Sequence, residues 1–195
     1  MSESIYGAHL PEMIEIQQEM EARVESIRRE LAGKLGMDPV EHCLSRIKSE
    51  ESMREKCRRN DLPETTESAL EVLHDAIGFR IVCAFVDDVY TIRDRLTAFA
   101  DCKVVTEKDY IRHAKPNGYR SYHMILRIRE TYYVEFQLRT ISMDTWAALE
   151  HHLKYKKHVA NESLIVQELK RCADELASTD ISMQTIRDLI LQDEV

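Results

Sequence analysis

Residues 122–139 alternate between apolar and polar side chains, with one short interruption at Glu130 and Thr131. Successive side chains of a β-strand point to opposite faces of a sheet, so this alternation predicts two strands joined by a tight turn. The second strand carries Glu135 and Gln137 on one face, among tyrosine, valine, phenylalanine and leucine. A carboxylate and an amide therefore project together from a sheet face, beside a loop rich in cations and aromatic side chains.

Helical periodicity dominates much of the remaining chain. Apolar residues recur every three or four positions from Leu10 to Leu35, which predicts an amphipathic helix that packs on its own core or on a second subunit. A β-branched run from Phe79 to Val86 predicts a central strand, and a polar strand near a sheet edge is expected at 103–110. The other predicted elements are helices at 49–59, from Thr66 or Ser68 to Gly78, after Asp87 and Asp88, at 142–156, and at 161–192 with a possible break at 178–180.

This order of elements predicts an α/β (α+β) chain in which a mixed β-sheet is flanked by helices. A chain of 195 residues is long enough for one good core and short for two, so residues 1–195 are expected to form a single domain. The five cysteines are scattered and lack a C-x-x-C spacing, which predicts reduced thiols rather than a disulfide framework or a zinc site.

Charge and hydropathy narrow the possible partners. A net charge of −8 argues against binding to a nucleic-acid backbone, although local basic segments still suit small phosphorylated ligands. No apolar run approaches the roughly 20 residues of a membrane span, so no membrane partner is expected. The N-terminal residues lack the layout of a signal peptide, and a cytoplasmic protein is therefore expected.

The segment from Arg46 to Lys56 has the residues for binding phosphate. Lys48 precedes the predicted helix at 49–59, and Ser52 and Lys56 lie four residues apart on one face of that helix. A helix N-terminus attracts anions, so this geometry suits a triphosphate. A solvated, salt-bridged surface helix is the commoner explanation for such a run taken alone.

A second candidate group runs from His74 to Arg80. Asp75 at a helix end and Arg80 at a strand start could hold a metal ion and a base or phosphate, respectively, or could simply pair with each other. The adjacent residues His74 and Asp75 also resemble the His-Asp pair of metal-dependent phosphohydrolases. The other upstream histidines of such a site and its large helical domain are missing, so we reject hydrolysis as the activity.

The loop from Lys108 to His123 is dense in cations, amides and aromatic side chains. Tyr119 offers a flat surface on which a base could stack, and Gly118 would let the backbone approach a ligand closely. Lys108, Lys115 and His123 could meet the phosphates of that ligand. An ordinary surface turn at the Asn-Gly pair is the structural alternative.

Two further groups have a possible metal role. Glu135 in mid-strand either points to solvent or meets a cation, because a buried carboxylate without a partner is costly. Glu150, His151 and His152, with His158 nearby, invite a zinc proposal. The H-E-x-x-H spacing is absent, however, so structural or partner-binding roles are expected for these histidines.

Several of these segments, in this order, are similar to the synthetase domain of the RelA/SpoT family, specifically to its short, stand-alone alarmone synthetases. The similarity runs from about Arg46 to Lys156 and rests on R-x-K, D-x-x-G-x-R, K-x-N-G-Y-R-S-x-H, E-x-Q-x-R-T and E-H-x-L-x-Y-K. It implies a nucleotidyltransferase-like synthetase fold. It also implies (p)ppGpp synthesis, in which the β,γ-diphosphate of ATP moves to the 3′-hydroxyl of GDP or GTP and AMP is released.

The resemblance implies roles for the residues on the ATP side. Arg46 and Arg80 pack on the adenine, whereas Lys48, Ser52 and Lys56 hold the phosphates.

Catalytic and acceptor roles follow from the same resemblance. Asp75 and Glu135 are the implied ligands of Mg²⁺, and Glu135 is placed to orient or deprotonate the 3′-hydroxyl of the acceptor. Gln137 and Arg139 are expected to support them. The implied GDP/GTP-binding residues are Lys108, Lys115, Tyr119, which stacks on the guanine, His123 and Gln137.

One functional alternative is a nucleotide-sensing module that kept the fold but lost turnover. The presence of all the principal positions argues against it. Members of the family often assemble through their outer helices, so helices 10–35 and 161–192 are the expected oligomerisation elements of a homotetramer. GDP, GTP and GMP stay open as acceptors.

Overall fold

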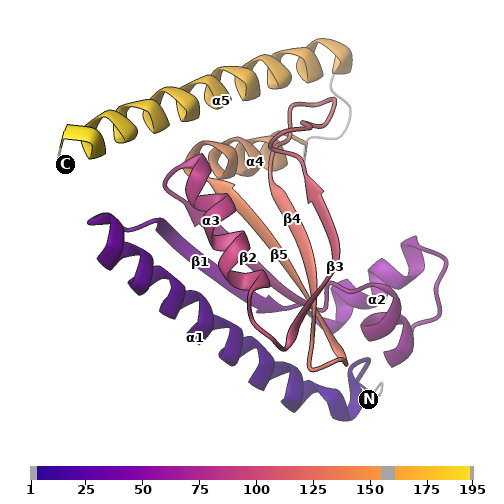
Figure 1. Ribbon diagram of the computed structural model, residues 1–195. Coiled ribbons are helices and arrows are strands. Elements are labelled where there is room, and N and C mark those ends of the chain that lie inside the picture. Colours follow the sequence, from indigo (N-terminus) through magenta and orange to yellow (C-terminus); the bar gives the residue numbers. More distant parts are fainter. Residues whose placement is uncertain (1–3, 155–160, 194–195) are drawn as a thin grey trace.

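The computed structural model describes residues 4–154 and 161–193 of the chain. At its centre is a five-stranded sheet with the order β1-β2-β5-β4-β3 (Figure 1). Strands β2 and β5 run parallel and the other neighbouring pairs run antiparallel, so the sheet is mixed, as predicted. The strands are β1 (Val40–Ile47), β2 (Ile77–Cys83), β3 (Cys102–Asp109), β4 (Tyr122–Ile128) and β5 (Tyr132–Thr140).

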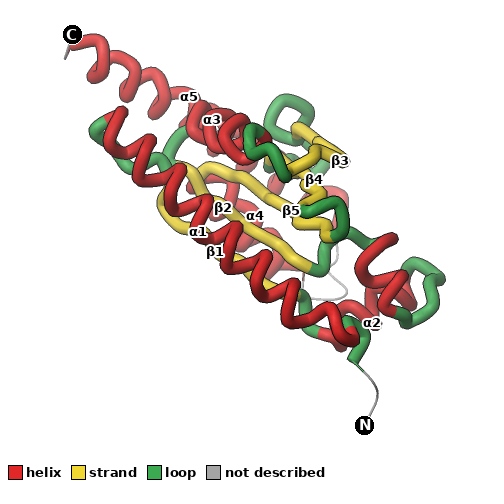
Figure 2. The backbone as a smooth tube through the Cα atoms, turned by 60° about the horizontal axis from the view of Figure 1, so that its bottom comes forward, coloured by secondary structure: helices red, strands yellow, loops and turns green. Residues whose placement is uncertain are grey.

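Helices α1 and α3 contact each other and cover the apolar face of the sheet (Figures 1 and 2). Helix α4 follows β5 directly and packs against α5, which runs past the end of the sheet (Figure 1). The long helices are α1 (Leu10–Leu35), α2 (Glu50–Arg59), α3 (Val86–Thr97), α4 (Ile141–Lys154) and α5 (Glu162–Asp193), with short turns at Gly7–His9 and Ser68–Val72.

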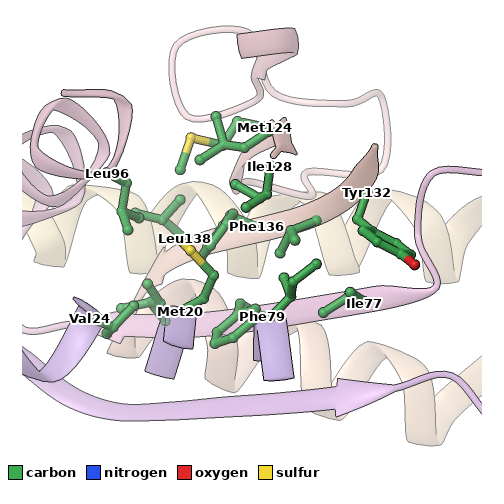
Figure 3. Close-up of a cluster of buried hydrophobic side chains, with 14 of the residues drawn as sticks. Met20, Val24, Ile77, Phe79, Leu96, Met124, Ile128, Tyr132, Phe136 and Leu138 are labelled. Atoms are coloured by element: carbon green, nitrogen blue, oxygen red, sulfur yellow. The ribbon is translucent and has the colours of Figure 1, made fainter. Parts of the chain in front are cut away.

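The core lies between the apolar face of the sheet and these two covering helices. Phe79 of β2 stacks on Phe136 of β5 with ring centroids 4.9 Å apart. Met20 of α1 and Leu96 of α3 belong to the same cluster (Figure 3). Full burial of such a side chain contributes roughly 1.5–3 kcal/mol, so this face is firmly committed to packing. The opposite face of the sheet is therefore the one left for polar groups.

The amphipathic stripe of α1 is buried on the chain's own sheet. Its members expose at most 7% of their surface. Of the two predicted uses of this stripe, packing on the chain's own core is the one observed, so a subunit contact through α1 would have to use other residues. The stripe consists of Met13, Ile16, Met20, Val24, Ile27 and Leu31.

Strand β1 is absent from the elements that the sequence pattern predicts. It pairs with β2 alone, at the edge of the sheet, where polar side chains are tolerated. A register shift between Val40 and His42 also interrupts its alternation. The sheet therefore has five strands, whereas the sequence pattern predicts four.

The predicted helix ending at Gly78 is wrong over its second half. A single π-helical turn spans Ser68–Val72, and His74 then adopts a left-handed φ of 52°. Ile77 and Gly78 belong to β2, where Gly78 lies opposite Glu135 of β5. Ile77 fits the helical spacing of its predecessors, but pairing with β5 supplies backbone hydrogen bonds and buries its side chain.

Helix α5 is continuous through residues 178–180, so the predicted break is wrong. The hydroxyls of Thr179 and Ser182 donate to carbonyls one turn earlier in the helix instead of interrupting it. Asp180 faces inward and accepts a hydrogen bond from Thr140 at 2.6 Å. The helix is thereby tied to the end of β5.

The other predicted elements agree with the structure to within a few residues, including the polar edge strand β3 and the hairpin of β4 and β5. Helix α4 is described as far as Lys154, so the last two residues of the predicted helix 142–156 lie outside the described residues. Within the two described ranges, no helix has both the length and the apolar character that crossing a bilayer requires.

Candidate active site

The polar face of the sheet gathers the predicted site residues in two rows. Strand pairing places Arg46 of β1 opposite Gly78 of β2, and Gly78 opposite Glu135 of β5. Paired residues of neighbouring strands share a face, so charges far apart in the sequence meet on one surface. The second row, two residues further along β5, consists of Arg80, Gln137, His123 and Lys108 from β2, β5, β4 and β3.

A cavity of about 150 Å³ opens on this face between β1, β2 and β5. Arg46 and Arg80 are exposed residues that both line it, the guanidinium of Arg80 lies 3.7 Å from Asp144, and Leu44 is 56% exposed. Planar guanidinium groups stack on flat rings, so this surface suits a purine. The lining residues are Leu44, Ser45, Arg46, Gly78, Phe79, Arg80, Glu135 and Gln137.

Three charged side chains meet where β1 enters α2. Lys48 and Lys56 both donate to Oδ2 of Asp75, the latter at 2.6 Å. The other carboxylate oxygen, Oδ1, is buried and has no hydrogen-bond partner among the described residues. A buried unpartnered acceptor is costly, and it marks a place where a cation would be stabilised. The predicted phosphate lysines and the predicted metal ligand therefore lie in one cluster.

Tyr6 supports this cluster, although no pattern in the sequence marks it. Its hydroxyl donates to the carbonyl of Lys48 at 2.7 Å, and its ring is 1% exposed. Burial first, and then the charge of Asp75, raise the pKa of Tyr6, so the hydroxyl keeps its proton and its donor role. The N-terminal segment thus fixes the backbone at the start of α2.

The turn that carries Asp75 is held against β5. His74 stacks on Tyr133 with ring centroids 3.7 Å apart and planes 25° from parallel. The Nε2 atom of His74 lies 2.7 Å from the carbonyl of Glu71 and donates to it. Tyr133 and Glu135 are two residues apart on β5, so their side chains share a face. The stack therefore connects the two segments that carry the candidate metal ligands.

Arg139 is buried at the end of β5 and orients several candidate residues. Its guanidinium donates to the hydroxyl of Tyr119 at 2.7 Å and to Oε1 of Gln137 at 3.2 Å. Gln137 in turn donates to Glu135 at 3.3 Å. Asp144 of α4 accepts from Arg139 at 3.1 Å and balances its charge. The family resemblance implies a supporting role for Arg139, and its partners come from β5 itself, from the β3–β4 loop and from α4.

His123 of β4 lies between Tyr119 and Glu135. Its Nε2 is 2.8 Å from the Tyr119 hydroxyl, and its Nδ1 is 3.9 Å from Glu135. Burial first, and then the positive charge of Arg139, lower the pKa of His123 to about 4. The ring is therefore neutral at neutral pH, and its contact with Glu135 is no ion pair. Arg139 already donates to the Tyr119 oxygen. We therefore assign the Tyr119 hydroxyl as donor to an unprotonated Nε2 of His123, and we place the proton of the imidazole ring on Nδ1.

Acidification is expected to destabilise the fold through His123. The pKa of His123 is about 4 in the folded protein against 6.5 for the free side chain. The contribution of neutral His123 to the unfolding free energy is therefore complete above pH 6.5 and is lost as the pH falls toward 4. Between pH 7 and pH 5 the loss is about 2 kcal/mol of unfolding free energy. Urea unfolding at both pH values measures it. His123→Gln should remove this part of the pH dependence, and an identical dependence in both proteins would contradict the low pKa.

The loop between β3 and β4 contains the cation and the aromatic plate predicted for a base. The Nζ atom of Lys115 lies 4.9 Å from the ring centroid of Tyr119 and 4.5 Å from that of Tyr110. Asn117 donates to Glu150 of α4 at 3.3 Å. The loop is therefore folded on itself and on α4, and Tyr110 is a member that the sequence pattern does not single out.

Gly118 makes a close approach to α5, whereas its position in the loop predicted a close approach to a ligand. Its φ is +92°, and a Cβ added there would lie 2.6 Å from the Cβ of Ala173 and 3.1 Å from the Cα of Lys170. Real Cβ atoms essentially never come as close as 2.6 Å to another heavy atom, and 3.1 Å is tighter than nine in ten such contacts. The small residue is thus required by the C-terminal helix.

Some candidate residues stand apart from these contacts. Ser52 is exposed in the first turn of α2, where its hydroxyl accepts from Ser49 at 2.9 Å. His151 and His152 are exposed on α4, and His158 lies outside the described residues. In the part of the chain that is described, no three His, Cys, Asp or Glu side chains gather as a metal cluster.

The sequence matches the family described as a region found in RelA / SpoT proteins over residues 45–160. Two GTP pyrophosphokinases of Bacillus subtilis are similar to most of the chain. YwaC is 40% identical over 159 residues, which is 78% of this chain and 76% of that protein. YjbM is 32% identical over 177 residues, which is 87% of this chain and 82% of that protein.

Solved structures agree with the sequence comparisons. Small alarmone synthetase 1 of Bacillus subtilis, bound to its product pppGpp, superposes with a TM-score of 0.77 and 31% identity, covering 91% of this chain and 94% of that one. Small alarmone synthetase 2 of the same organism gives a TM-score of 0.75 and 35% identity, covering 88% and 92%. The predicted fold class is therefore confirmed. The matching region, the similar relatives and the shared structure together show that the chain belongs to the RelA/SpoT family.

Proposed function

We propose that this chain is a (p)ppGpp synthetase that transfers the β,γ-diphosphate of ATP to the 3′-hydroxyl of GDP or GTP and releases AMP. The observation that carries this function is the sheet register, which sets Glu135 opposite Gly78, and Gly78 follows Asp75 by only three residues in the chain. Two relatives that match most of the chain are GTP pyrophosphokinases, and one solved relative holds pppGpp. Phosphoryl-type transfer requires positioning and charge neutralisation, and both are available on this face.

The cavity between β1, β2 and β5 is the ATP side of the site. Arg46 and Arg80 present their guanidinium groups there and would pack on the adenine. Lys48 and Lys56 would bind the phosphates as point charges. Ser52 stands in the first turn of α2, where backbone N–H groups and the helix dipole favour an anion.

The β3–β4 loop and the second row of the sheet form the acceptor side. Tyr119 would stack on the guanine, which is worth roughly 1–3 kcal/mol for a base on an aromatic ring. Neutral His123 offers a hydrogen bond in place of a charge, and Glu135 would accept the proton of the 3′-hydroxyl. Three residues complete the proposed acceptor-binding set. Lys108 and Lys115 would face the acceptor's phosphates, and Gln137 donates to the Glu135 carboxylate.

Asp75 and Glu135 would hold Mg²⁺. The buried Oδ1 of Asp75, which lacks a partner among the described residues, and the carboxylate of Glu135 are the hard oxygen donors that this ion prefers. The bound ion supplies positive charge against the negative charge of the phosphates. Gln137 and Arg139 keep the Glu135 carboxylate in place through the hydrogen bonds already described.

Incubation of the purified protein with ATP, GDP and Mg²⁺ tests this function. Anion-exchange chromatography should show AMP and, in equal amount, a guanosine nucleotide with two additional phosphates. A catalytically silent nucleotide-sensing module of the same fold would bind both nucleotides and release no AMP. The same assay with GTP and GMP ranks the three acceptors. Nucleotide substrates of this kind are consistent with an enzyme of the cytoplasm.

We also propose that the protein is a homotetramer that assembles through its C-terminal helices. Large apolar side chains are exposed along α4 and α5, and a surface of this kind is typical of a subunit interface. Members of this surface are Leu149, Leu153, Leu164, Val166, Ile181, Met183, Ile186, Leu189 and Ile190.

Light scattering is expected to give a particle of about 91 kDa, which is four chains of 22.8 kDa. The double variant Ile186→Lys/Leu189→Lys should reduce this mass, because two charges would have to be buried at the interface. Val72→Lys, at an exposed apolar position far from α5 in the sequence, is the matched control and should keep the mass. A wild-type particle of 22.8 kDa would remove the assembly proposal.

A further inference from the structure

Helix α5 packs directly on the loop that carries Tyr119 (Figure 1). This acceptor loop comprises residues 110–121, between β3 and β4. Its contact point is Gly118, which is buried and which has no room for a Cβ because Ala173 and the backbone of Lys170 lie against it. Gly118 is more than 50 residues from Lys170 and Ala173 in the sequence, so this fit is a tertiary feature of the fold.

Polar contacts fasten the same junction. Arg120 donates to Asp174 at 3.0 Å and to the carbonyl of Ala173 at 3.4 Å. It also donates to the carbonyl of Gly118 at 3.1 Å, so one guanidinium connects both sides. Only 18% of the Arg120 side chain is exposed, which makes it part of the junction and leaves it little access to a ligand.

Trp146 connects the junction to the aromatic plate. Its Nε1 donates to the carbonyl of Leu169 in α5 at 2.8 Å, and its ring lies 6.4 Å from that of Tyr119 in an edge-on arrangement. Tyr119 is therefore enclosed by Trp146 on α4, by Arg139 and His123 from the sheet, and through Gly118 by α5. The contacts of α5 therefore reach the plate through Gly118 and through Trp146.

We propose that α5 is a positioning element for the acceptor nucleotide, acting through Ala173 and Asp174 on the shape of the acceptor loop. This rests on the proposed function, in which Tyr119 stacks on guanine. Ordering a flexible backbone costs conformational entropy, and a loop held in its binding conformation by α5 does not incur that cost when the ligand binds. Among the described residues, none that lines the ATP cavity comes from α5, so acceptor binding and ATP binding should respond differently to changes in this helix.

Ala173→Leu tests the steric contact. The added side chain would displace Gly118 and should raise the KM for GDP by about tenfold or more, while the KM for ATP stays within about twofold of wild type. Cys172→Leu is the matched control, since it adds an equally large side chain at the exposed neighbouring position. Equal rises for GDP and ATP in Ala173→Leu, or no rise for either, would overturn the proposal.

Asp174→Ala tests the polar contact with Arg120. Glu175→Ala is its matched control, because it removes a neighbouring carboxylate that pairs with Arg171 within α5. Because the Asp174 side chain is 44% exposed, we expect a rise of only about threefold in the KM for GDP. Glu175→Ala should behave as wild type. The same rise in both variants would show that the effect is general charge loss and would overturn the role of Asp174.

A second readout does not require turnover. Trp146 is the only tryptophan of the chain, and it contacts both α5 and the Tyr119 ring, so its fluorescence should report GDP binding in the absence of ATP. The dissociation constant of GDP should rise in Ala173→Leu by the same factor as KM, and an unchanged constant would count against the proposal. If wild-type protein binds GDP with this sensitivity but releases no AMP from ATP, the proposed function fails and the role of α5 stands.

Discussion

Glu135→Gln is expected to lower kcat by about a thousandfold, because it removes the proposed general base and one of the two carboxylates proposed to hold Mg²⁺. Glutamine has nearly the same shape and can keep the contact with Gln137. The KM values for ATP and GDP should therefore stay within a few-fold of wild type. Steady-state kinetics with each substrate varied in turn measures the split between kcat and KM.

Glu130→Gln is the control for that change. Glu130 is an exposed residue of the β4–β5 turn, so its variant loses one carboxylate of the same hairpin without approaching the polar face of the sheet. It should retain wild-type kinetics. Wild-type turnover in Glu135→Gln would show that another group deprotonates the acceptor.

Asp75→Asn is expected to change ATP binding in two opposite directions. Without metal, ATP should bind about tenfold more tightly, because Lys48 and Lys56 no longer share a carboxylate and are free to bind the phosphates. With Mg²⁺ present, turnover should fall by about a hundredfold or more, since one of the two carboxylates proposed to hold the ion is gone. Titration calorimetry with ATP in a chelator, and rates over a range of Mg²⁺ concentration, give the two numbers.

Asp61→Asn provides the matched control. Asp61 is exposed just after α2 and has a left-handed φ of 54°, which asparagine adopts readily, so the change removes a nearby charge without strain. Both measurements should match wild type in this variant. Weaker metal-free ATP binding in Asp75→Asn would contradict the assignment of the two lysines to the phosphates.

The parts of the fold that were predictable are those with strong local periodicity. The stripe of α1 and the alternation of β4 and β5 each specify one apolar face, and the core forms where those faces meet. β1 lies at the sheet edge with a mixed pattern, and its strand state comes from pairing with β2. The local sequence around Ile77 is compatible with either a helix or a strand. Pairing with β5, a segment distant in the sequence, selects the strand.

The candidate site shows the same division between local and long-range information. Single motifs indicated the chemistry of Asp75, Tyr119 and Glu135, since carboxylates and an aromatic beside cations are recognisable wherever they occur. Their common location depends on strand register, which the motifs do not contain. The contacts of Gly118 with α5, and of Tyr6 with the cluster around Asp75, join segments more than 40 residues apart. No local pattern could have predicted them.

ATP that carries different labels on its β and γ phosphates offers the most direct test of diphosphate transfer on this sheet face. With wild-type protein, GDP and Mg²⁺, both labels should appear in the guanosine product in equal amounts, and the released AMP should carry neither. Product that contains the γ label alone, with ADP released in place of AMP, would show an ordinary kinase and would contradict the account.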